Sequence, residues 1–347
     1  MCYNRERICK KSLTEQTMKA KKIFSAIALA MGFTVLASCT DASTTFTLGE
    51  YWKYNSLITE EIHEVVTYDV TFNDEDYGGM NNLGYTVSYD NGTYKTVLKS
   101  ETKDGEVIYN YATEFSIDVT YTCNDEEETF TDTVVSSVSF YGADKKLQPI
   151  YSTKTTVSHS PMIGDDQTST KYCYSVFNQT VETNYEGEEW TCVVIDHTLN
   201  EGDKGYKTTD TFEKDEKLTF FDNEQLLVAA RAFGPSVLSG KAQTYQQVID
   251  NTQNVKYTFA DSDEEEGREF SLLINDAEET VKKKISYRTV SLVFDDKNPG
   301  ATQTAWIATG GATKNTYRNI MLYLETPLSY GIGKLVYTIN GVSGVLS

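Results

Sequence analysis

Residues 83–98 read LGYTVSYDNGTYKTVL, and this stretch determines the expected fold class. Apolar and polar residues alternate on both sides of the pair Asn91-Gly92. Alternation with a period of two is typical of a β-strand that has one buried face and one solvated face. An Asn-Gly pair between two such runs is a strong signal for a two-residue hairpin turn. We therefore predict a β-hairpin that turns at Asn91-Gly92.

The same alternation continues through most of the chain. From 107 to 123 the apolar residues fall mainly on one face, and polar turns are expected at 103–106, 124–128 and 144–149. Further strands are expected at 134–140, 150–157, 172–181, 190–195, 245–249, 255–259, 270–274, 285–294, 320–324 and 335–339. Because no fixed-period repeat and no Pro/Ser-rich linker divides them, we predict a single antiparallel β domain over 49–347. The expected fold class is mainly β, a large curved antiparallel meander sheet that is half-barrel-like.

One segment breaks the β pattern and predicts a short helix. Asp222 is a capping residue and Gln225 follows three positions later, which is close to a capping box. Leu226 and Phe233 frame an apolar stripe at helical spacing, and Gly234-Pro235 supplies a termination signal. Because only one stripe of this helix is apolar, we expect it to pack against the sheet.

The N-terminal segment Met18–Cys39 has the composition of a bacterial export signal. Three lysines precede a nearly continuous apolar run at 23–36, and small residues precede Cys39. The run has 14 residues, whereas a membrane-spanning helix needs about 20. Its lysine-rich and polar flanks are also unusual for a buried core helix. The segment resembles the signal peptide of bacterial lipoproteins, with Leu36-Ala37-Ser38-Cys39 in the place of the lipobox.

This resemblance implies that the Cys39 thiol is lipidated and that the signal 18–38 is removed before it. The mature protein would then carry a polar tether at 39–48 and lie outside the cytoplasm, anchored to a bacterial cell membrane. Because signal peptides begin at their charged end, residues 1–17 are interpreted as a mis-assigned start. We favour the outer face of a plasma membrane over an outer membrane.

Residues 50–68 fit either a helical turn or two, or a first strand.

The chain is strongly acidic, with 31 Lys or Arg against 51 Asp or Glu and a formal net charge of −20. Residues 1–38 hold seven of the basic and two of the acidic side chains, so the expected mature part has a net charge of −25. Such a surface repels phosphate backbones and anionic headgroups. We therefore expect no nucleic-acid partner, and membrane contact through the lipidated Cys39 alone. We also expect a monomer.

Three cysteines follow Cys39 in the expected mature chain. Cys123, Cys173 and Cys192 form an odd set, so at most one disulfide can close among them. We favour three buried thiols. If a bridge forms instead, the expected pair is Cys173 and Cys192, which lie on adjacent predicted strands. Neither has a second ligand at close spacing, so they do not form a metal set, and we expect no metal and no cofactor.

No complete catalytic or metal-binding motif is present. His63-Glu64 begins like the zinc-protease helix motif, but Thr67 stands where the second histidine is needed. The segment 234–241 resembles a phosphate loop with the wrong glycine spacing. The alternating acids of 261–265 lack the glycine and glutamate positions of a calcium loop, so we interpret them as a solvated loop. No Gly-x-Ser-x-Gly nucleophile motif occurs.

The order of elements resembles that of the LolA/LppX-like half-barrel superfamily of envelope domains. The resemblance spans 84–341 and includes Lys146-Leu147-Gln148-Pro149 before a strand, the helix at 222–233, and Trp306 near the last hairpin. Members of that superfamily curl one sheet into an open barrel and cover its concave face with helices, and some hold acyl chains there. The resemblance therefore implies a concave sheet face, although the carriers have more helices than the one predicted here.

Three hypotheses about function follow. The leading one is a non-enzymatic, lipid-anchored envelope protein whose curved sheet binds or shuttles an apolar or lipid ligand. The first alternative is a surface module that binds glycans or proteins, in which Trp52, Trp190 and Trp306 would be sugar platforms if they are not core residues. The second alternative is a hydrolase with dispersed carboxylates, because the spacing of such a pair is spatial and a sequence does not reveal it.

Overall fold

The computed structural model describes most of the chain after residue 61. The described ranges are 62–74, 83–162, 169–187, 189–213, 219–232, 242–249, 251–259, 267–293, 302–309, 319–328 and 331–344. The predicted signal at 18–38 and Cys39 with its tether at 39–48 lie outside them.

The described residues form seventeen strands, one short α-helix and a few 3₁₀ turns, which confirms the predicted mainly β class. The strands are β1 (His63–Asn73), β2 (Thr86–Lys103), β3 (Glu106–Cys123), β4 (Glu126–Tyr141), β5 (Pro149–Pro161), β6 (Tyr174–Asn184), β7 (Glu189–Asp196), β8 (Lys207–Glu213), β9 (Phe220–Phe221), β10 (Ala242–Ile249), β11 (Asn251–Phe259), β12 (Arg268–Ile274), β13 (Val281–Ile285), β14 (Tyr287–Val293), β15 (Gln303–Ala308), β16 (Met321–Pro327) and β17 (Lys334–Ser343). Of the segment 50–68, the part from His63 onward is a strand, so the strand interpretation is confirmed there.

Backbone hydrogen bonds join these strands into one large sheet. Strands β1 to β8 pair consecutively and antiparallel, and β1 also pairs with β17. The ladder continues from β17 through β16, β15, β14 and β11 to β10. Two short parallel pairings, β9 with β10 and β12 with β17, are the exceptions within the described part. The predicted large antiparallel sheet is thus confirmed.

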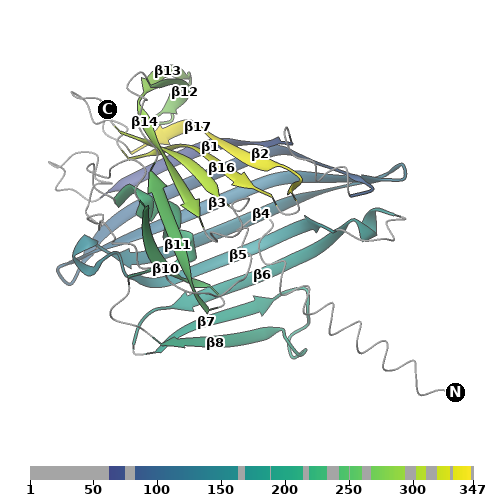
Figure 1. Cartoon of the computed structure of the whole chain (residues 1–347), viewed down its shortest axis with the longest axis horizontal. Helices are drawn as coiled ribbons and strands as arrows, with labels where there is room; N and C mark the ends of the chain where they lie inside the picture. Colours follow the sequence, from purple (N-terminus) through teal and green to yellow (C-terminus); the bar gives the residue numbers. More distant parts are fainter. Residues whose placement is uncertain are drawn as a thin grey trace.

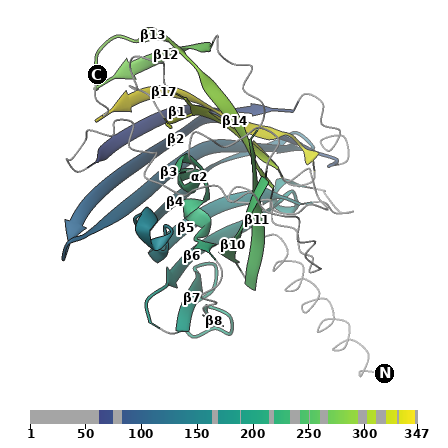
Figure 2. The ribbon, with the colours of Figure 1, turned by 60° about the vertical axis from the view of Figure 1, so that its left-hand side comes forward.

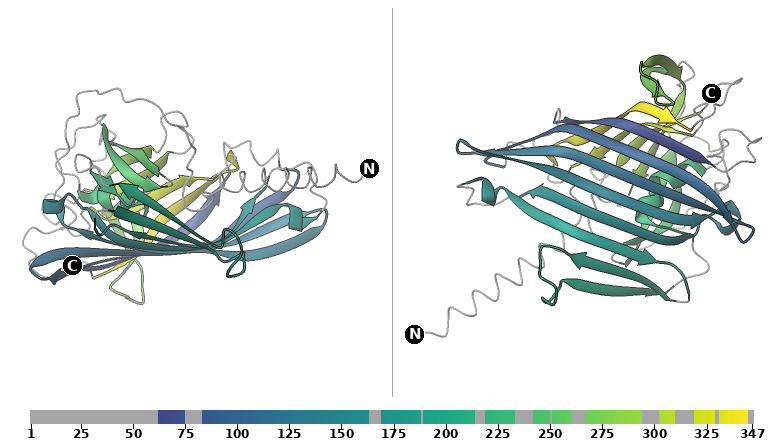
Figure 3. Two further views of the ribbon diagram at one scale, coloured as in Figure 1. Left: turned by 90° about the horizontal axis from the view of Figure 1, so that it is seen from below. Right: turned by 180° about the vertical axis from the view of Figure 1, so that it is seen from behind.

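The sheet is curved so that its two halves face each other (Figures 1 and 3). The long strands β1–β8 form one wall, and β10, β11 and β14–β17 cross over its concave side (Figure 1). The helix α2 (Leu226–Ala229) lies over the concave side of the long strands (Figure 2). Seen from behind, the long strands present their other face with no strand or helix crossing it (Figure 3, right).

The helix begins as the sequence predicts. The side chain of Asp222 accepts a hydrogen bond from the backbone amide of Glu224, and the side-chain oxygen of Gln225 accepts one from the backbone amide of Asp222. This reciprocal capping box is confirmed. The α-helical turn is flanked by the 3₁₀ turns η4 (Asn223–Gln225) and η5 (Ala230–Ala232), so the element is short. Phe233 and Gly234-Pro235 lie outside the described residues.

The predicted turn at Asn91-Gly92 is wrong. Strand β2 runs through this pair, and its register with β3 shifts by one residue between Asp90 and Thr93, which is a β-bulge. The reason is a tertiary contact, because β1 pairs with β2 at this point. The backbone of Val70 comes so close to Gly92 that a Cβ there would lie 2.4 Å from the Val70 carbonyl oxygen. The two-residue turns of this region fall instead at 104–105 and 124–125, where both central residues have positive φ.

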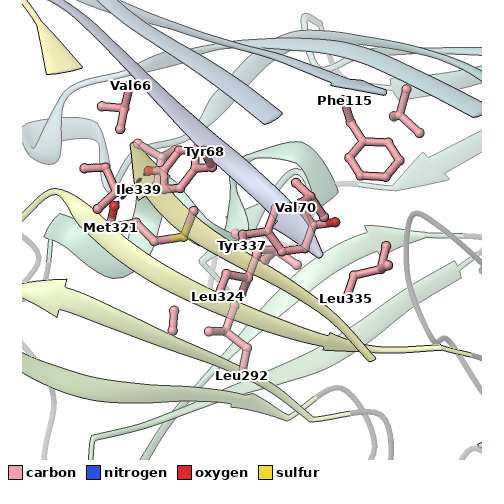
Figure 4. Close-up of a cluster of buried hydrophobic side chains, with 14 of the residues drawn as sticks. Val66, Tyr68, Val70, Phe115, Leu292, Met321, Leu324, Leu335, Tyr337 and Ile339 are labelled. Atoms are coloured by element: carbon pink, nitrogen blue, oxygen red, sulfur yellow. Dashed lines mark hydrogen bonds between the residues drawn. The ribbon is translucent and has the colours of Figure 1, made fainter. Parts of the chain in front are cut away.

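The core fills the space between the two walls (Figure 4). Odd-numbered residues of β3 and even-numbered residues of β4 point into it, as their alternation predicts. Two buried tyrosines of this core donate hydrogen bonds to backbone carbonyls: Tyr68 to that of Met321 and Tyr257 to that of Leu226, both at 2.8 Å. Such pairing keeps buried phenols from destabilising the fold.

Candidate functional site

The predicted lipidation residue, Cys39, lies outside the described residues, so its modification stays a prediction. None of the helices in the described part of the chain has the length and apolar character that crossing a bilayer requires.

No disulfide links Cys173 to Cys192; in the structure both are thiols, as is Cys123. The predicted pairing fails because the register of β6 with β7 puts Thr183, and not Cys173, opposite Cys192. Cys192 packs against a small separate core of Tyr185, Trp190, Phe212 and Phe220. Cys173 instead lies within hydrogen-bonding reach of Cys123. Cys123 and Cys173 are buried, whereas Cys192 is only half-buried.

The concave side of the sheet is the place where a lipid ligand was expected. Buried side chains from both walls and from the helix form one continuous cluster there. Its members include not only aliphatic residues but also several tyrosines, such as Tyr109 and Tyr121. The lipid-binding hypothesis stays a prediction.

A buried ion pair ties the helical segment to the long strands. Arg231 of η5 donates two hydrogen bonds to the carboxylate of Glu64 on β1, at 2.7 and 2.9 Å. Both side chains are almost fully buried. Burial lowers the pKa of Arg231, but the adjacent Glu64 carboxylate more than offsets this, so the pKa is raised and the guanidinium stays charged. The bidentate geometry indicates a structural role.

Asp222 forms a second buried polar contact between helix and sheet. Its carboxylate accepts hydrogen bonds from Ser152 on β5, at 2.6 Å, and from the hydroxyl of Tyr185. Burial, followed by the nearby charge of Glu224, raises the pKa of Asp222 to about 6, although the hydrogen bonds from Ser152 and Tyr185 act in the opposite direction. This carboxyl group therefore titrates near neutral pH in the folded protein.

A third buried acid lies where β5 leaves β4. The β4–β5 pairing ends at Thr133–Val157, whereas the β5–β6 pairing continues to Pro161–Tyr174. Asp132, which is fully buried, accepts from the backbone amide of His159 at 2.9 Å and contacts its Nδ1 at 2.7 Å.

We call this region the β5–β6 corner, meaning residues 158–162 and 169–174 together with the ends of β2–β4 that they contact. The imidazole of His159 stacks on Phe130 at 3.9 Å between ring centroids, and Tyr174 packs edge-on against it. An imidazole oriented by a buried carboxylate also occurs in catalytic sites. Here the described ring neighbours are aromatic, so we assign the contact to holding the corner.

The opposite face of the long strands has a different chemistry. We call the solvent-facing side chains of β3–β6 the outer face. They are mostly hydroxyl and amide side chains: Asn110, Ser116, Thr120, Thr129, Thr131, Thr133, Ser137, Ser139, Thr153, Thr155, Asn178 and Thr180. Neighbouring strands pair these groups directly, as in Thr120–Thr129 at 2.9 Å and Thr155–Thr180 at 3.2 Å.

Three large apolar side chains stand out on the outer face. Val135 is 53% exposed, Val176 is 47% exposed and Tyr151 is 40% exposed. Partial burial, followed by the charge of Glu182, raises the pKa of Tyr151, so its hydroxyl remains protonated and can donate a hydrogen bond. The outer face therefore combines an aromatic ring with rows of hydroxyls spaced at the distance between strands, about 4.8 Å.

The tryptophans do not form exposed platforms in the described structure. Trp190 is 1% exposed and belongs to the small core. Trp306 is half-buried and stacks on Tyr287 at 4.4 Å and on Tyr323 at 4.0 Å between centroids. Because β14 and β16 flank β15, these two tyrosines cover opposite faces of the indole. Trp306 is thus unsuited to stacking on a sugar, and Trp52 lies outside the described residues.

Within the described ranges, no three His, Cys, Asp or Glu side chains gather as a metal site would require. His63 is exposed on β1, so the partial zinc-protease motif lies on a strand. Two other predicted segments fall outside the described residues: the phosphate-loop-like residues 234–241 and the acidic residues 261–265.

Comparison with known proteins found no relatives: no family model, no curated protein and no solved structure matches this chain. The resemblance to LolA/LppX-like domains therefore stays a prediction.

Sequence reasoning identified Asp222 as a helix cap but missed the buried contacts of Glu64 and Asp132. Glu64 and Asp132 occupy inward-facing positions in alternating strands, as in Phe130-x-Asp132-x-Val134, and a carboxylate in such a row signals a buried partner. The partner itself was not visible, because Arg231 lies 167 residues from Glu64.

Proposed function

We propose that this chain is a non-enzymatic, lipid-anchored protein of the bacterial envelope that recognises a neutral polysaccharide through its outer face. The observation that carries the proposal is the uncovered face of β3–β6, where Tyr151 projects from rows of hydroxyl and amide side chains. The anchor at Cys39 would hold the domain at a membrane surface.

The chemistry of the outer face supports a sugar ligand. Sugar hydroxyls both donate and accept hydrogen bonds, as do the threonine, serine and asparagine side chains of this face. An exposed tyrosine can pack its ring against the apolar C–H face of a sugar while its hydroxyl stays in water. A flat surface spanning several long strands suits an extended polymer better than a small molecule, which favours a concave pocket.

The charge of the chain supports a neutral ligand. With a formal net charge of −20, the protein repels acidic polysaccharides and nucleic acids. If no neutral polysaccharide binds, we expect the ligand of the outer face to be a protein.

Binding to a panel of neutral polysaccharides tests the proposal. The full mature protein, kept in detergent micelles, is titrated with each polymer in a calorimeter. We expect Tyr151→Ala to weaken binding at least about tenfold, which is the loss typical of a central aromatic contact. Tyr172→Ala is the matched control, because Tyr172 is 46% exposed but lies on η3 (Thr170–Tyr172) at the β5–β6 corner. Equal affinity of the wild type and Tyr151→Ala would contradict the proposal.

The anchor needs its own experiment. Growth with a labelled fatty acid should label the wild-type protein and not Cys39→Ala. Label retained by the variant, or absent from the wild type, would contradict the lipidation.

The lipid-carrier hypothesis predicts a different result. Native mass spectrometry of the protein from residue 45 onward would then find a co-purified lipid, although this form lacks the anchor. A bound lipid would favour the carrier over the polysaccharide-binding module.

A further inference from the structure

The β5–β6 corner contains Cys123 and Cys173, two cysteines that the sequence analysis did not pair with each other. Cys123 is the last residue of β3 and Cys173 lies immediately before β6. Their exposed fractions are 2% and 0%. The thiol of Cys173 is within hydrogen-bonding reach of the thiol of Cys123, and it also donates to the carbonyl of Ser169 at 3.5 Å.

Other contacts at this corner also join the ends of β2–β4 to the segment around Cys173. The hydroxyl of Tyr85 contacts both the amide and the carbonyl of Met162 at 3.0 Å. Glu126 accepts from the amide of Thr170 at 3.3 Å, and Glu128 accepts from the hydroxyl of Tyr174 at 3.1 Å. The two thiols therefore meet where the structure already holds these segments together by several non-covalent contacts.

We propose that Cys123 and Cys173 form a disulfide that closes the β5–β6 corner when the protein folds in an oxidising compartment. The pairing rests on the contact between the two thiols and on the hydrogen bonds that hold this corner together. The supply of oxidant in the cell rests on the extracytoplasmic location proposed above. Disulfides persist outside the cytoplasm, where thiols are not kept reduced. Cys192, which belongs to a separate core, stays a thiol.

The reaction is a thiol–disulfide exchange with a disulfide-bearing oxidant, such as oxidised glutathione. The thiolate of one cysteine attacks a sulfur of the oxidant, forms a mixed disulfide and releases one thiolate. The thiolate of the second cysteine then attacks the protein sulfur of that mixed disulfide and releases the other. Two protein thiols become one disulfide, and the oxidant is reduced to two thiols, so electrons and protons balance.

Burial determines when this reaction takes place. Desolvation on burial, followed by the adjacent thiol of Cys123, raises the pKa of Cys173 to about 12. Little reactive thiolate exists in the folded state. We therefore expect the bridge to form while the corner is still open. Once folded and reduced, the protein should be oxidised at least about ten times more slowly than when it is unfolded in urea.

Refolding in a glutathione redox buffer tests the pairing without reference to cellular location. The full mature protein is unfolded, reduced and refolded with oxidised and reduced glutathione, and its peptides are mapped by mass spectrometry without reduction. We expect one cross-linked peptide that joins Cys123 to Cys173, and one alkylatable thiol, Cys192. A bridge from Cys173 to Cys192, or three alkylatable thiols, would overturn the proposal.

Thermal unfolding gives a second measurement. A loop of this length should raise the melting temperature of the oxidised protein by about 5 °C over the reduced protein. Cys192→Ser should keep that difference, whereas Cys123→Ser and Cys173→Ser should abolish it. If either of the latter variants does not fold, the peptide map of the wild type still decides. Protein taken from the cell envelope reports on location separately: a reduced pair there, together with a bridge in the refolding test, would contradict only the proposed compartment.

Discussion

The two faces of the long strands differ in what they contact, although alternating residues of the same strands form both faces. On β4, Val138 is 1% exposed and points into the core, whereas Val135 is 53% exposed on the outer face. The inner face meets the second wall and the helix; the outer face meets solvent. The comparison teaches that stability depends on the inner face, whereas the outer face is the surface that, under our proposal, binds a partner.

The largest expected effect is on the inner face, at the buried ion pair. Arg231→Met should destabilise the protein by about 3–5 kcal/mol, because it leaves the buried carboxylate of Glu64 without its partner. Urea unfolding followed by circular dichroism measures this. The double variant Glu64→Gln with Arg231→Met should recover part of the loss, since no uncompensated charge remains. A single variant as stable as the wild type would show that the pair is not buried in solution.

The next effect depends on pH. Because the pKa of Asp222 is raised to about 6 in the folded state, from an ordinary value of 3.8, the folded protein binds this proton more tightly than the unfolded chain. The contribution of Asp222 is thus fully present below about pH 4 and is lost as pH rises through 6, by about 3 kcal/mol.

Asp222→Asn isolates this contribution, because asparagine can still cap the helix but does not ionise. Urea unfolding at intervals from pH 4 to 8 should show the stability of the wild type falling relative to the variant across that range. Parallel pH profiles for the two proteins would refute the assignment of a raised pKa to Asp222.

A matched pair of substitutions compares the two faces directly. Val138→Thr should cost about 1–3 kcal/mol, because it buries a hydroxyl in an apolar core. Val135→Thr should change stability by less than about 0.5 kcal/mol, as exposed substitutions usually do. Both are read from chemical denaturation under one condition. Equal losses at the two positions would contradict the assignment of an inner and an outer face.

Whether a feature could be predicted from the sequence depends on how far apart in the chain its interacting residues lie. The side-chain alternation of β3 and β4 is local, so the sequence predicted the sheet and its two faces. The capping box of Asp222 and Gln225 is local as well, and it was predicted. The Asn91-Gly92 pair was misread because the bulge there depends on the approach of β1, which is a tertiary contact.

The candidate sites were harder to predict for the same reason. Cys173 and Cys192 were the expected pair if a bridge formed, but the register of β6 and β7 places Thr183 opposite Cys192. The outer face could be expected from the polar half of each alternating strand. That it is left uncovered depends on which side the second wall crosses, and no local pattern specifies that side.

Hydroxyl-radical footprinting tests the central claim, that the outer face is the binding face, most directly. In the full mature protein, Tyr151 should be oxidised readily, while the buried Tyr109 and Tyr121 should not. Addition of a neutral polysaccharide that binds should protect Tyr151 and leave Tyr172 reactive. Binding that leaves the reactivity of Tyr151 unchanged would contradict the account.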